Sequence, residues 1–328
     1  MRLFRAPRGS YIMRYYVGID IGGMTIKGIV LDPKGKALCE DVAVTGSERG
    51  GDAMCDVISE LVNAMLSKCG VKKEDIAIGV GCPGVIDSEN GILVFSGNLN
   101  LRDYPLADKL HERLDVPVSV TNDANAAALG EAKFGAGKNY KNSILVTLGT
   151  GVGGGIIIDG KLFEGYKSAG AEIGHMVIER HGDVCTCGRR GCFEAYCSAT
   201  ALVRRTRRQM EDNPRSAMWT KYTSETANGK TAFDFYHDDI DAKEVVDWYI
   251  KYLACGLANL ANIFRPEIIM IGGGVSEQGD NLTVPLQTYV DKELFGGTSY
   301  APVKIVKASL GSKAGAYGAA ALAMKVEL

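Results

Sequence analysis

The sequence predicts an α/β protein with two similar domains around a central cleft. Short apolar runs alternate along the chain with longer segments in which apolar residues recur at intervals of three and four, as in alternating strands and helices. A unit of strand, glycine-rich turn and strand occurs near the start and again near the middle, which indicates an internal duplication. A length of 328 residues suits two domains, and a hydrophobic content of 46% is enough to fill their cores.

Composition and charge exclude several classes of protein. The chain has 37 Lys and Arg against 39 Asp and Glu, so it has no general basic surface for nucleic acid or an anionic membrane. No apolar run approaches the ~20 residues of a membrane span. Nine cysteines, and a start without a secretory signal, indicate a reduced, cytoplasmic protein. The arginine-rich residues 1–12 are interpreted as an upstream start or a disordered extension.

The first half of the chain alternates strands and helices. Apolar and β-branched runs, separated by glycine or by an Asp-Pro-Lys-Gly turn, indicate the strands. These strands are 15–21, 26–31, 37–44, 76–81 and 116–120. A helix is expected from about 52 to 69, because apolar residues repeat there at three and four and Gly70 follows as a stop. Two further helices are expected at 106–114 and 123–134, the second from its alanines.

The second half repeats this order. Two strands flank a glycine turn, and three more are indicated by short apolar runs. These strands are 143–148, 155–158, a short one near 176–178, 267–271 and 303–306. Helices are expected at 195–210, at 242–264, between the last two strands, and from about 314 to the end.

The 41 glycines concentrate where strands turn, at 18–23, 149–155 and 272–274. Turns without Cβ atoms let backbone N–H groups approach a phosphate chain, while Thr150 can add a hydroxyl and Asp20 can hold a phosphate-bound Mg²⁺. Neither a Walker loop nor the G-x-G-x-x-G of a dinucleotide fold is present. Each cluster by itself also fits an ordinary β-hairpin. Similar hairpins in duplicated positions, with Gly-Gly-Gly after a buried strand, favour a cradle for nucleotide phosphates.

Four potential metal ligands lie close together in the second half. His175, Cys185, Cys187 and Cys192 supply one imidazole and three thiolates, a set suited to tetrahedral Zn²⁺. The alternative is a loop with free thiols. Cys197 lies beyond the group, and His181 is the alternative imidazole.

Several motifs occur in order: DIGG at 20–23, PG at 83–84, NDANAAALGE at 122–131, LGTGVGGGI at 148–156, and EIGH at 172–175 followed by C-x-C-G-x-x-G-C. With these motifs the chain resembles, from about Tyr15 to its C-terminus, the ROK family (repressor, open reading frame, kinase), within the superfamily of sugar kinases, actin and Hsp70. The resemblance implies two duplicated ribonuclease-H-like domains of the actin-like ATPase type. It also implies a smaller domain of 1–122 plus 314–328, and a larger domain of 123–313 that carries the zinc loop. Met24 departs from the usual Thr of the family, and Thr25 follows it.

The resemblance implies that Asp123 is the catalytic base, which takes a proton from a sugar hydroxyl as that oxygen attacks the γ-phosphorus of ATP. Taken locally, Asn122-Asp123 also fits a helix cap. The implied sugar ligands are Gly84, Asn98, Asn122, Asp123, Glu172, His175 and Glu194, with Asn100 as the alternative to Asn98 in the same loop. The implied contacts to ATP and its Mg²⁺ are Asp20, Gly22, Gly23, Thr25, Lys27, Thr150, Gly151, Gly272, Gly273 and Gly274. The zinc ion would be structural and would orient the sugar ligands near it.

The family contains both sugar kinases and sugar-responsive repressors. Fewer than about twenty residues precede the first strand, too few for a helix-turn-helix domain, so a kinase is expected. The stretch CTCGRRGCFE and the run NIFRPE at 262–267 resemble the glucokinases of the family, which implies transfer of phosphate from ATP to the 6-hydroxyl of glucose. A kinase of N-acetylmannosamine, N-acetylglucosamine or another hexose is the alternative. The family suggests a homodimer or homotetramer.

Overall fold

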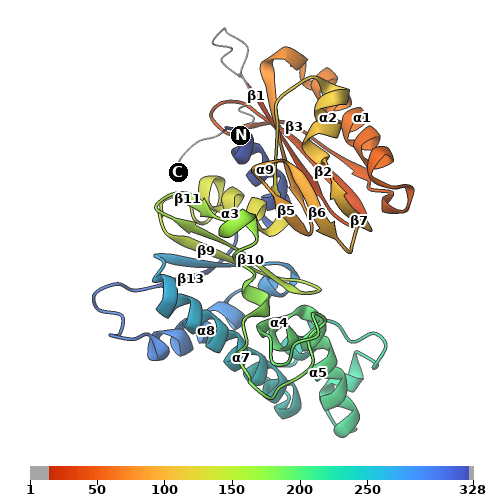
Figure 1. Ribbon diagram of the computed structural model, residues 1–328. Helices are drawn as coiled ribbons and strands as arrows, with labels where there is room; N and C mark the ends of the chain where they lie inside the picture. Colours follow the sequence, from red (N-terminus) through yellow and green to blue (C-terminus); the bar gives the residue numbers. More distant parts are fainter. Residues whose placement is uncertain (1–14, 325–328) are drawn as a thin grey trace. The chain divides into compact units, whose positions relative to one another are not determined.

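The computed structural model describes residues 15–324 and shows the strands and helices of Figure 1. The predicted extension at 1–12 lies outside the described residues. Within them the chain forms two compact units, one of 15–123 with 319–324 and one of 124–318. The domain boundaries expected from the sequence, at 122/123 and 313/314, stay a prediction. None of the described helices combines the length and apolar composition that crossing a bilayer requires.

The first unit contains a mixed sheet with the strand order β3-β2-β1-β4-β8. Its strands are β1 (Tyr15–Ile21), β2 (Thr25–Leu31), β3 (Ala37–Val44), β4 (Ile76–Cys82) and β8 (Val118–Asn122). The first three strands are antiparallel neighbours, whereas β4 and β8 run parallel to β1. Every residue of β4 is buried, as expected for a central strand with both faces of its sheet covered.

Helices cover both faces of this sheet. On one face lies α1 (Gly51–Cys69), where a Cβ on Gly28 would come within 2.5 Å of a methionine side chain of the helix. On the other lies α9 (Ala314–Met324), where a Cβ on Gly79 would be 1.8 Å from the carbonyl oxygen of Ala319. The pairing register places Gly28 and Gly79 in neighbouring rows of the sheet, whose side chains point to opposite faces. The close approach of α9 therefore requires a glycine in β4.

A small antiparallel sheet in the first unit is a feature that the sequence analysis does not predict. Its strands are β5 (Val85–Asp87), β6 (Ile92–Ser96) and β7 (Leu101–Tyr104), and α2 (Leu106–Leu114) follows them. These strands are short, and their buried and exposed positions do not alternate regularly, so the sequence lacks the period-two pattern of a strand. The sheet bears on function because β5 begins directly after Gly84.

The second unit contains a sheet of the same construction, with the order β11-β10-β9-β12-β13. Its strands are β9 (Ser143–Leu148), β10 (Val152–Ile158), β11 (Lys161–Phe163), β12 (Ile268–Gly272) and β13 (Lys304–Lys307). As in the first unit, three antiparallel strands are followed by two strands parallel to the first of them. This repetition confirms the predicted duplication of the α/β fold.

The third strand of the second sheet lies at 161–163, so its prediction near 176–178 is wrong. Val177 makes only an isolated bridge, to Cys192, and does not join the sheet. Likewise, the single helix predicted at 195–210 is two helices, α4 (Phe193–Cys197) and α5 (Ala199–Asp212). The break is at Ser198, whose side chain accepts a hydrogen bond from the N–H of Ala201 and caps α5, a position that serine favours.

The remaining helices of the second unit are α3 (Asp123–Phe134), α6 (Thr231–Asp234), α7 (Ile240–Phe264) and α8 (Asp280–Glu293). The helix α7 provides the central part of the larger core, because residues along most of its length are buried. The helix α3 packs instead on a smaller apolar cluster, which contains Ala128, Leu145 and Met270. At one side α3 packs against α9 through glycines: a Cβ on Gly318 would lie 1.5 Å from the carbonyl oxygen of Ala126, and one on Gly130 would lie 2.3 Å from that of Ala314.

A buried carboxylate fastens α3 to the segment before α9. Glu131 is fully buried, and its Oε1 accepts a hydrogen bond of 2.6 Å from the N–H of Leu310. Its Oε2 accepts from the N–H of Ala136 at 2.9 Å and from the N–H of Ser309 at 3.1 Å. Since these donors belong to two separate segments, the carboxylate stabilises their junction.

The variant Glu131→Ala is expected to lower the free energy of unfolding by about 3 kcal/mol, because the buried N–H groups of two segments lose their acceptor. Urea denaturation followed by circular dichroism measures this change. The control is Glu60→Ala on the exposed side of α1, which should change the same free energy by less than about 0.5 kcal/mol. Equal stabilities of the two variants would contradict the proposed junction.

Candidate functional site

Two carboxylates meet at the carboxyl ends of parallel strands in the first unit. Asp20 is near the end of β1, and Asp123 is the first residue of α3, directly after β8. The strands β1, β4 and β8 run parallel, so their carboxyl ends share one edge of the sheet, the usual location of ligand sites in α/β folds. Burial raises the pKa of Asp20 to about 6, with a further contribution from the negative charge of Asp123 and an opposing one from Lys27. The two carboxylates are thus close enough to repel each other.

The raised pKa of Asp20 predicts a pH-dependent stability. Between pH 4 and 6 the folded protein binds more protons at this group than the unfolded chain does, so stability falls as the pH rises through this window. By pH 7.5 the loss is up to about 3 kcal/mol. The variant Asp20→Asn should therefore be more stable than the parent at pH 7.5 without Mg²⁺, and close to it at pH 4.

Chemical denaturation at the two pH values tests this expectation. The exposed Asp108→Asn on α2 is the matched control and should show no comparable gain. A variant Asp20→Asn that is less stable than the parent at pH 7.5 would show that the ionised carboxylate is held favourably in the fold.

The loop after β4 is joined to the end of β8 beside this pair. The side-chain amide of Asn122 donates a hydrogen bond of 3.0 Å to the carbonyl oxygen of Gly84. Gly84 has a φ of 119°, and a Cβ there would be 2.2 Å from the carbonyl oxygen of Phe95, so only glycine fits. The structure thus brings together Gly84, Asn122 and Asp123. Asn98, the other predicted sugar ligand of this unit, is exposed in the turn between β6 and β7.

The first glycine turn is closed by backbone hydrogen bonds. The N–H of Gly22 donates to the carbonyl oxygen of Thr25 at 2.9 Å, and the hydroxyl of Thr45 donates to the carbonyl oxygen of Gly22 at 2.7 Å. Met24 is 84% exposed at the tip of the turn, so the departure from the family pattern does not disturb the core. Lys27 lies opposite Asp20 in the register of β1 and β2. The predicted contacts to ATP in this unit therefore all lie on or beside one hairpin.

The two glycine turns of the second unit are neighbours. In the first, the N–H of Gly149 donates to the carbonyl oxygen of Gly151 at 3.0 Å, with Thr150 between them. In the second, Gly273 has a φ of 81°, and a Cβ there would be 2.4 Å from the carbonyl oxygen of Leu148. Leu148 directly precedes the first turn. The structure therefore brings together the predicted phosphate contacts at 150–151 and 272–274, although they are far apart in the sequence.

The first of these turns is also anchored to α5. The N–H of Ala199 donates to the carbonyl oxygen of Gly149 at 2.8 Å. The hydroxyl of Thr200 donates to the carbonyl oxygen of Thr150 at 2.9 Å. The sequence analysis does not identify either contact, because both depend on packing between segments that are about fifty residues apart.

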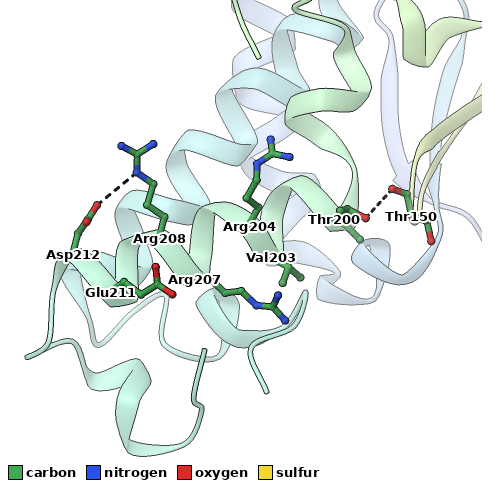
Figure 2. A pocket seen from close by; sticks show the side chains of 9 residues that line it. Thr150, Thr200, Val203, Arg204, Arg207, Arg208, Glu211 and Asp212 are labelled. Carbon is green, nitrogen blue, oxygen red and sulfur yellow. Dashed lines mark hydrogen bonds and ion pairs between the residues drawn. The ribbon is translucent and has the colours of Figure 1, made fainter. Parts of the chain in front are cut away.

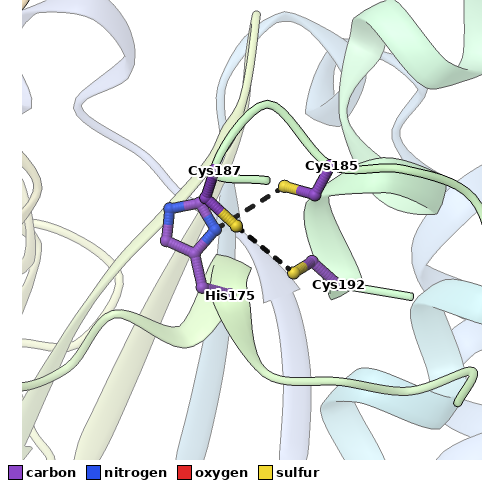
Figure 3. A group of neighbouring side chains, drawn as sticks. All are labelled: His175, Cys185, Cys187 and Cys192. Carbon is purple, nitrogen blue, oxygen red and sulfur yellow. Dashed lines mark hydrogen bonds between the residues drawn. The ribbon is translucent and has the colours of Figure 1, made fainter. Parts of the chain in front are cut away.

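The cysteine and histidine side chains form a compact cluster (Figure 3). The Sγ atoms of Cys187 and Cys192 are 3.7 Å apart, and Nδ1 of His175 is 3.8 Å from Sγ of Cys185. All four ligand atoms lie within 4.8 Å of one another. A tetrahedron with Zn–S distances of about 2.3 Å places its sulfur atoms about 3.8 Å apart, so the cluster has the size and chemistry of a zinc site. The cluster contains His175 and not His181, and Cys197 lies outside it, buried in α4.

Glu194 connects this cluster to the glycine turn at 149–151. Its Oε2 accepts a hydrogen bond of 3.0 Å from the N–H of Val152, and its Oε1 accepts from the hydroxyl of Thr186 at 3.0 Å and from the thiol of Cys185 at 3.6 Å. A Cβ on Gly151 would be 2.3 Å from Oε2, so the glycine makes room for the carboxylate. Sequence reasoning identifies Glu194 only as a sugar ligand and misses this connection.

The other predicted sugar ligand of the second unit, Glu172, is exposed and precedes a short turn, Ile173–His175. The N–H of His175 donates to the carbonyl oxygen of Glu172 at 3.1 Å, which closes the turn. The side chain of Glu172 is therefore available to a ligand. It lies on the segment that also carries His175 of the cluster.

The chain is similar to known proteins over most of its length. The model of the ROK family matches residues 16–326. A glucokinase of Halalkalibacterium halodurans is 40% identical over 284 residues, which cover 85% of this chain and 86% of that protein. A xylose repressor of Bacillus subtilis is 32% identical over 311 residues, which cover 93% of this chain and 75% of the repressor.

A solved structure gives the same result. A ROK family glucokinase from Streptomyces griseus, in complex with glucose and AMPPNP, is 35% identical to this chain with a TM-score of 0.80, and the match covers 95% of this chain and 100% of that one. The family match includes both glycine-turn sheets, the carboxylate pair and the cysteine cluster. This chain belongs to the ROK family.

Proposed function

We propose that this protein is an ATP-dependent glucokinase, which transfers the γ-phosphate of ATP to the 6-hydroxyl of glucose. Its glucokinase relatives are 36–40% identical over most of the chain, and the neighbour from Streptomyces griseus contains glucose and AMPPNP. The observation that carries the proposal is the pair of carboxylates, Asp20 and Asp123, at the carboxyl ends of parallel strands. A kinase needs one carboxylate for a metal bound to phosphate and one to accept a proton, and this pair provides both.

In this proposal Asp123 is the general base. It accepts the proton of the sugar hydroxyl while that oxygen attacks the γ-phosphorus, a contribution typically worth about 10²–10⁴ in rate. Asp20 would hold the Mg²⁺ of the nucleotide, directly or through water, and this ion neutralises the charge of the phosphate chain. Ionisation of Asp20 is required for that contact, so we expect the rate to decrease as the pH falls below about 6.

The phosphate chain would lie against backbone N–H groups of the glycine turns. The turn at 22–25 is in the first unit, and the turns at 149–151 and 272–274 are neighbours in the second. Thr150, Thr25 and Lys27 would add a hydroxyl or an ammonium group to the phosphate contacts.

We assign sugar binding to Gly84, Asn122 and Asp123 of the first unit, together with the more exposed Asn98, and to Glu172, His175 and Glu194 of the second. Because Nδ1 of His175 faces Cys185, its Nε2 is the atom available to a sugar hydroxyl. The engaged oxygens of Glu194 still have lone pairs, so this carboxylate can accept a further bond from a hydroxyl.

We assign Zn²⁺ to the cluster of His175, Cys185, Cys187 and Cys192, with a structural role. A metal there would order the loop, whose Thr186 hydroxyl donates to Glu194, and Glu194 in turn accepts from the N–H of Val152 beside the glycine turn. The zinc site would thus position His175 and Glu194 rather than act on the substrate.

We further propose a cytoplasmic enzyme that supplies glucose 6-phosphate to glycolysis and assembles as a homodimer or homotetramer. Light scattering coupled to size-exclusion chromatography measures the assembly.

The experiment that tests the proposed function is an assay of ADP release over a panel of hexoses. Glucose is expected to have the highest kcat/KM, with N-acetylmannosamine, N-acetylglucosamine, mannose and fructose as competitors. A higher value for an N-acetylhexosamine would contradict glucose as the substrate while leaving the hexose kinase intact. No ADP release with any hexose would contradict the kinase.

A further inference from the structure

A pocket of about 810 Å³ lies along α5 in the second unit (Figure 2). The charged and hydroxyl side chains that line it include Thr150, Arg204, Arg207, Arg208, Glu211 and Asp212. Thr150 belongs to the glycine turn to which the proposed function assigns phosphate. The pocket therefore begins at the phosphate turn and continues along the helix.

The dimensions of the pocket suit a nucleotide. An α-helix rises 1.5 Å per residue, so Thr200, whose hydroxyl donates to Thr150, and Glu211 are separated by about 16 Å along α5. An extended nucleoside triphosphate has a comparable length. With its phosphates at the glycine turn, its base would lie beside the arginines.

We propose that this pocket binds the nucleoside part of the phosphate donor and recognises the base by its flat face, so that the enzyme accepts donors with different bases. This inference rests on the proposed kinase function and adds the donor specificity of the same site.

The chemistry of the lining favours such tolerance. A guanidinium group stacks on a base of any kind, because every base has a π-face. At the edges of the base, arginines can donate to O6 and N7 of guanine, while the carboxylates of Glu211 and Asp212 can accept from the amino group of adenine. The pocket thus contains partners for both purines.

Arg208 is also not held as rigidly as strict selection would require. Strong discrimination between similar ligands needs buried polar groups that would be left unpaired by the wrong one. The side chain of Arg208 is 76% exposed, and its ion pair with Asp212 has a separation of 3.8 Å. A group of this kind can follow the shape of the base and does not reject a wrong edge.

The arginines differ in how they are held. Arg204 donates to the carboxylate of Asp183 at 3.1 Å and to the carbonyl oxygen of Ala195 at 2.8 Å, so it also supports the loop of the cysteine cluster. Arg208 is one helical turn further on, and Figure 2 shows both side chains extending from the same side of α5. Because Arg208 is constrained least, we assign it to the base, and its replacement should disturb the fold least.

The test is steady-state kinetics at saturating glucose with ATP, GTP, ITP and UTP as donors. Inorganic tripolyphosphate, which has phosphates but no base, is measured as a competitive inhibitor against ATP. We expect kcat/KM for GTP and ITP to lie within about tenfold of that for ATP, since stacking is insensitive to the identity of the base. In Arg208→Met the KM for ATP and GTP should rise about two- to fivefold, the size of a lost cation–π contact at an exposed site. The kcat and the Ki of tripolyphosphate should stay within twofold of the parent.

The matched control is Arg215→Met, an exposed arginine outside the pocket, which should leave every constant unchanged. Thermal unfolding verifies that both variants fold. An unchanged KM for ATP in Arg208→Met, with normal glucose phosphorylation by the parent, would overturn the pocket as donor site and leave the proposed kinase intact. A GTP efficiency more than about a hundredfold below that of ATP would overturn the base tolerance. Failure of the parent to phosphorylate any hexose would instead overturn the proposed function, and this inference with it.

Discussion

Replacing Asp123 by asparagine should lower kcat by about 10²–10⁴, while the KM for glucose changes by no more than a few-fold. The amide has the shape of the carboxylate and suits the first turn of α3, but it cannot accept the proton of the sugar hydroxyl. Removing one negative charge also relieves the repulsion on Asp20, so the fold should be at least as stable as in the parent. Initial rates of ADP release give kcat and KM, and calorimetric titration with glucose gives binding in the absence of turnover.

The control for this variant is Asp108→Asn, an exposed position on α2, which should retain the parent kcat. A second comparison is the pH profile, since a residue that acts only on structure would lower kcat without changing its dependence on pH. Near-native turnover by Asp123→Asn would show that the proton goes elsewhere and that this residue is only a helix cap.

The variant Cys187→Ser should lose the zinc ion and raise the KM for glucose by about 10–100-fold. Cys187 is the exposed member of the cluster, so its replacement leaves the packing of the core intact and removes only a ligand. Without the ion the loop is no longer ordered, and the carboxylate of Glu194 loses its support from that loop, where the hydroxyl of Thr186 donates to its Oε1. The expected effect is therefore on sugar binding more than on kcat. Metal content by mass spectrometry and KM from initial rates measure both parts.

The matched control here is Cys255→Ser, another exposed cysteine that lies outside the cluster. It should retain zinc and the parent KM. A metal-free Cys187→Ser protein with an unchanged KM for glucose would show that the cluster does not position the sugar ligands. Zinc retained at one ion per chain would show that three ligands are enough.

The predictions from sequence succeed where the signal is local. The strands β1, β2 and β9 follow from apolar, β-branched runs bounded by glycine, and α1 follows from apolar residues at intervals of three and four. The cysteine cluster can be predicted for the same reason, since Cys185, Cys187 and Cys192 lie within eight residues on one loop. Such features depend on residues that are neighbours along the chain, so the sequence alone is enough to predict them.

The predictions fail where a local pattern is weak or is overridden by packing. The strands β5, β6 and β7 are too short to show alternation, and the strand expected near 176–178 is replaced by an isolated bridge beside the cysteine loop. Ser198 separates α4 from α5, although the apolar periodicity continues across it and predicts a single helix. In each case the competing interaction is a turn or a cap.

The sequence by itself determined the α/β class, the repeated strand–turn–strand unit, the glycine turns and the candidate ligands of the cysteine cluster, because each depends on residues close together along the chain. Only the tertiary structure decided that Asp20 and Asp123 repel each other, that Gly273 approaches Leu148, and that Glu194 joins the cysteine loop to the glycine turn at 149–151. It also decided that α5 carries a pocket beginning at Thr150. These contacts connect distant segments, and their formation depends on how strands and helices pack, for which no local pattern exists.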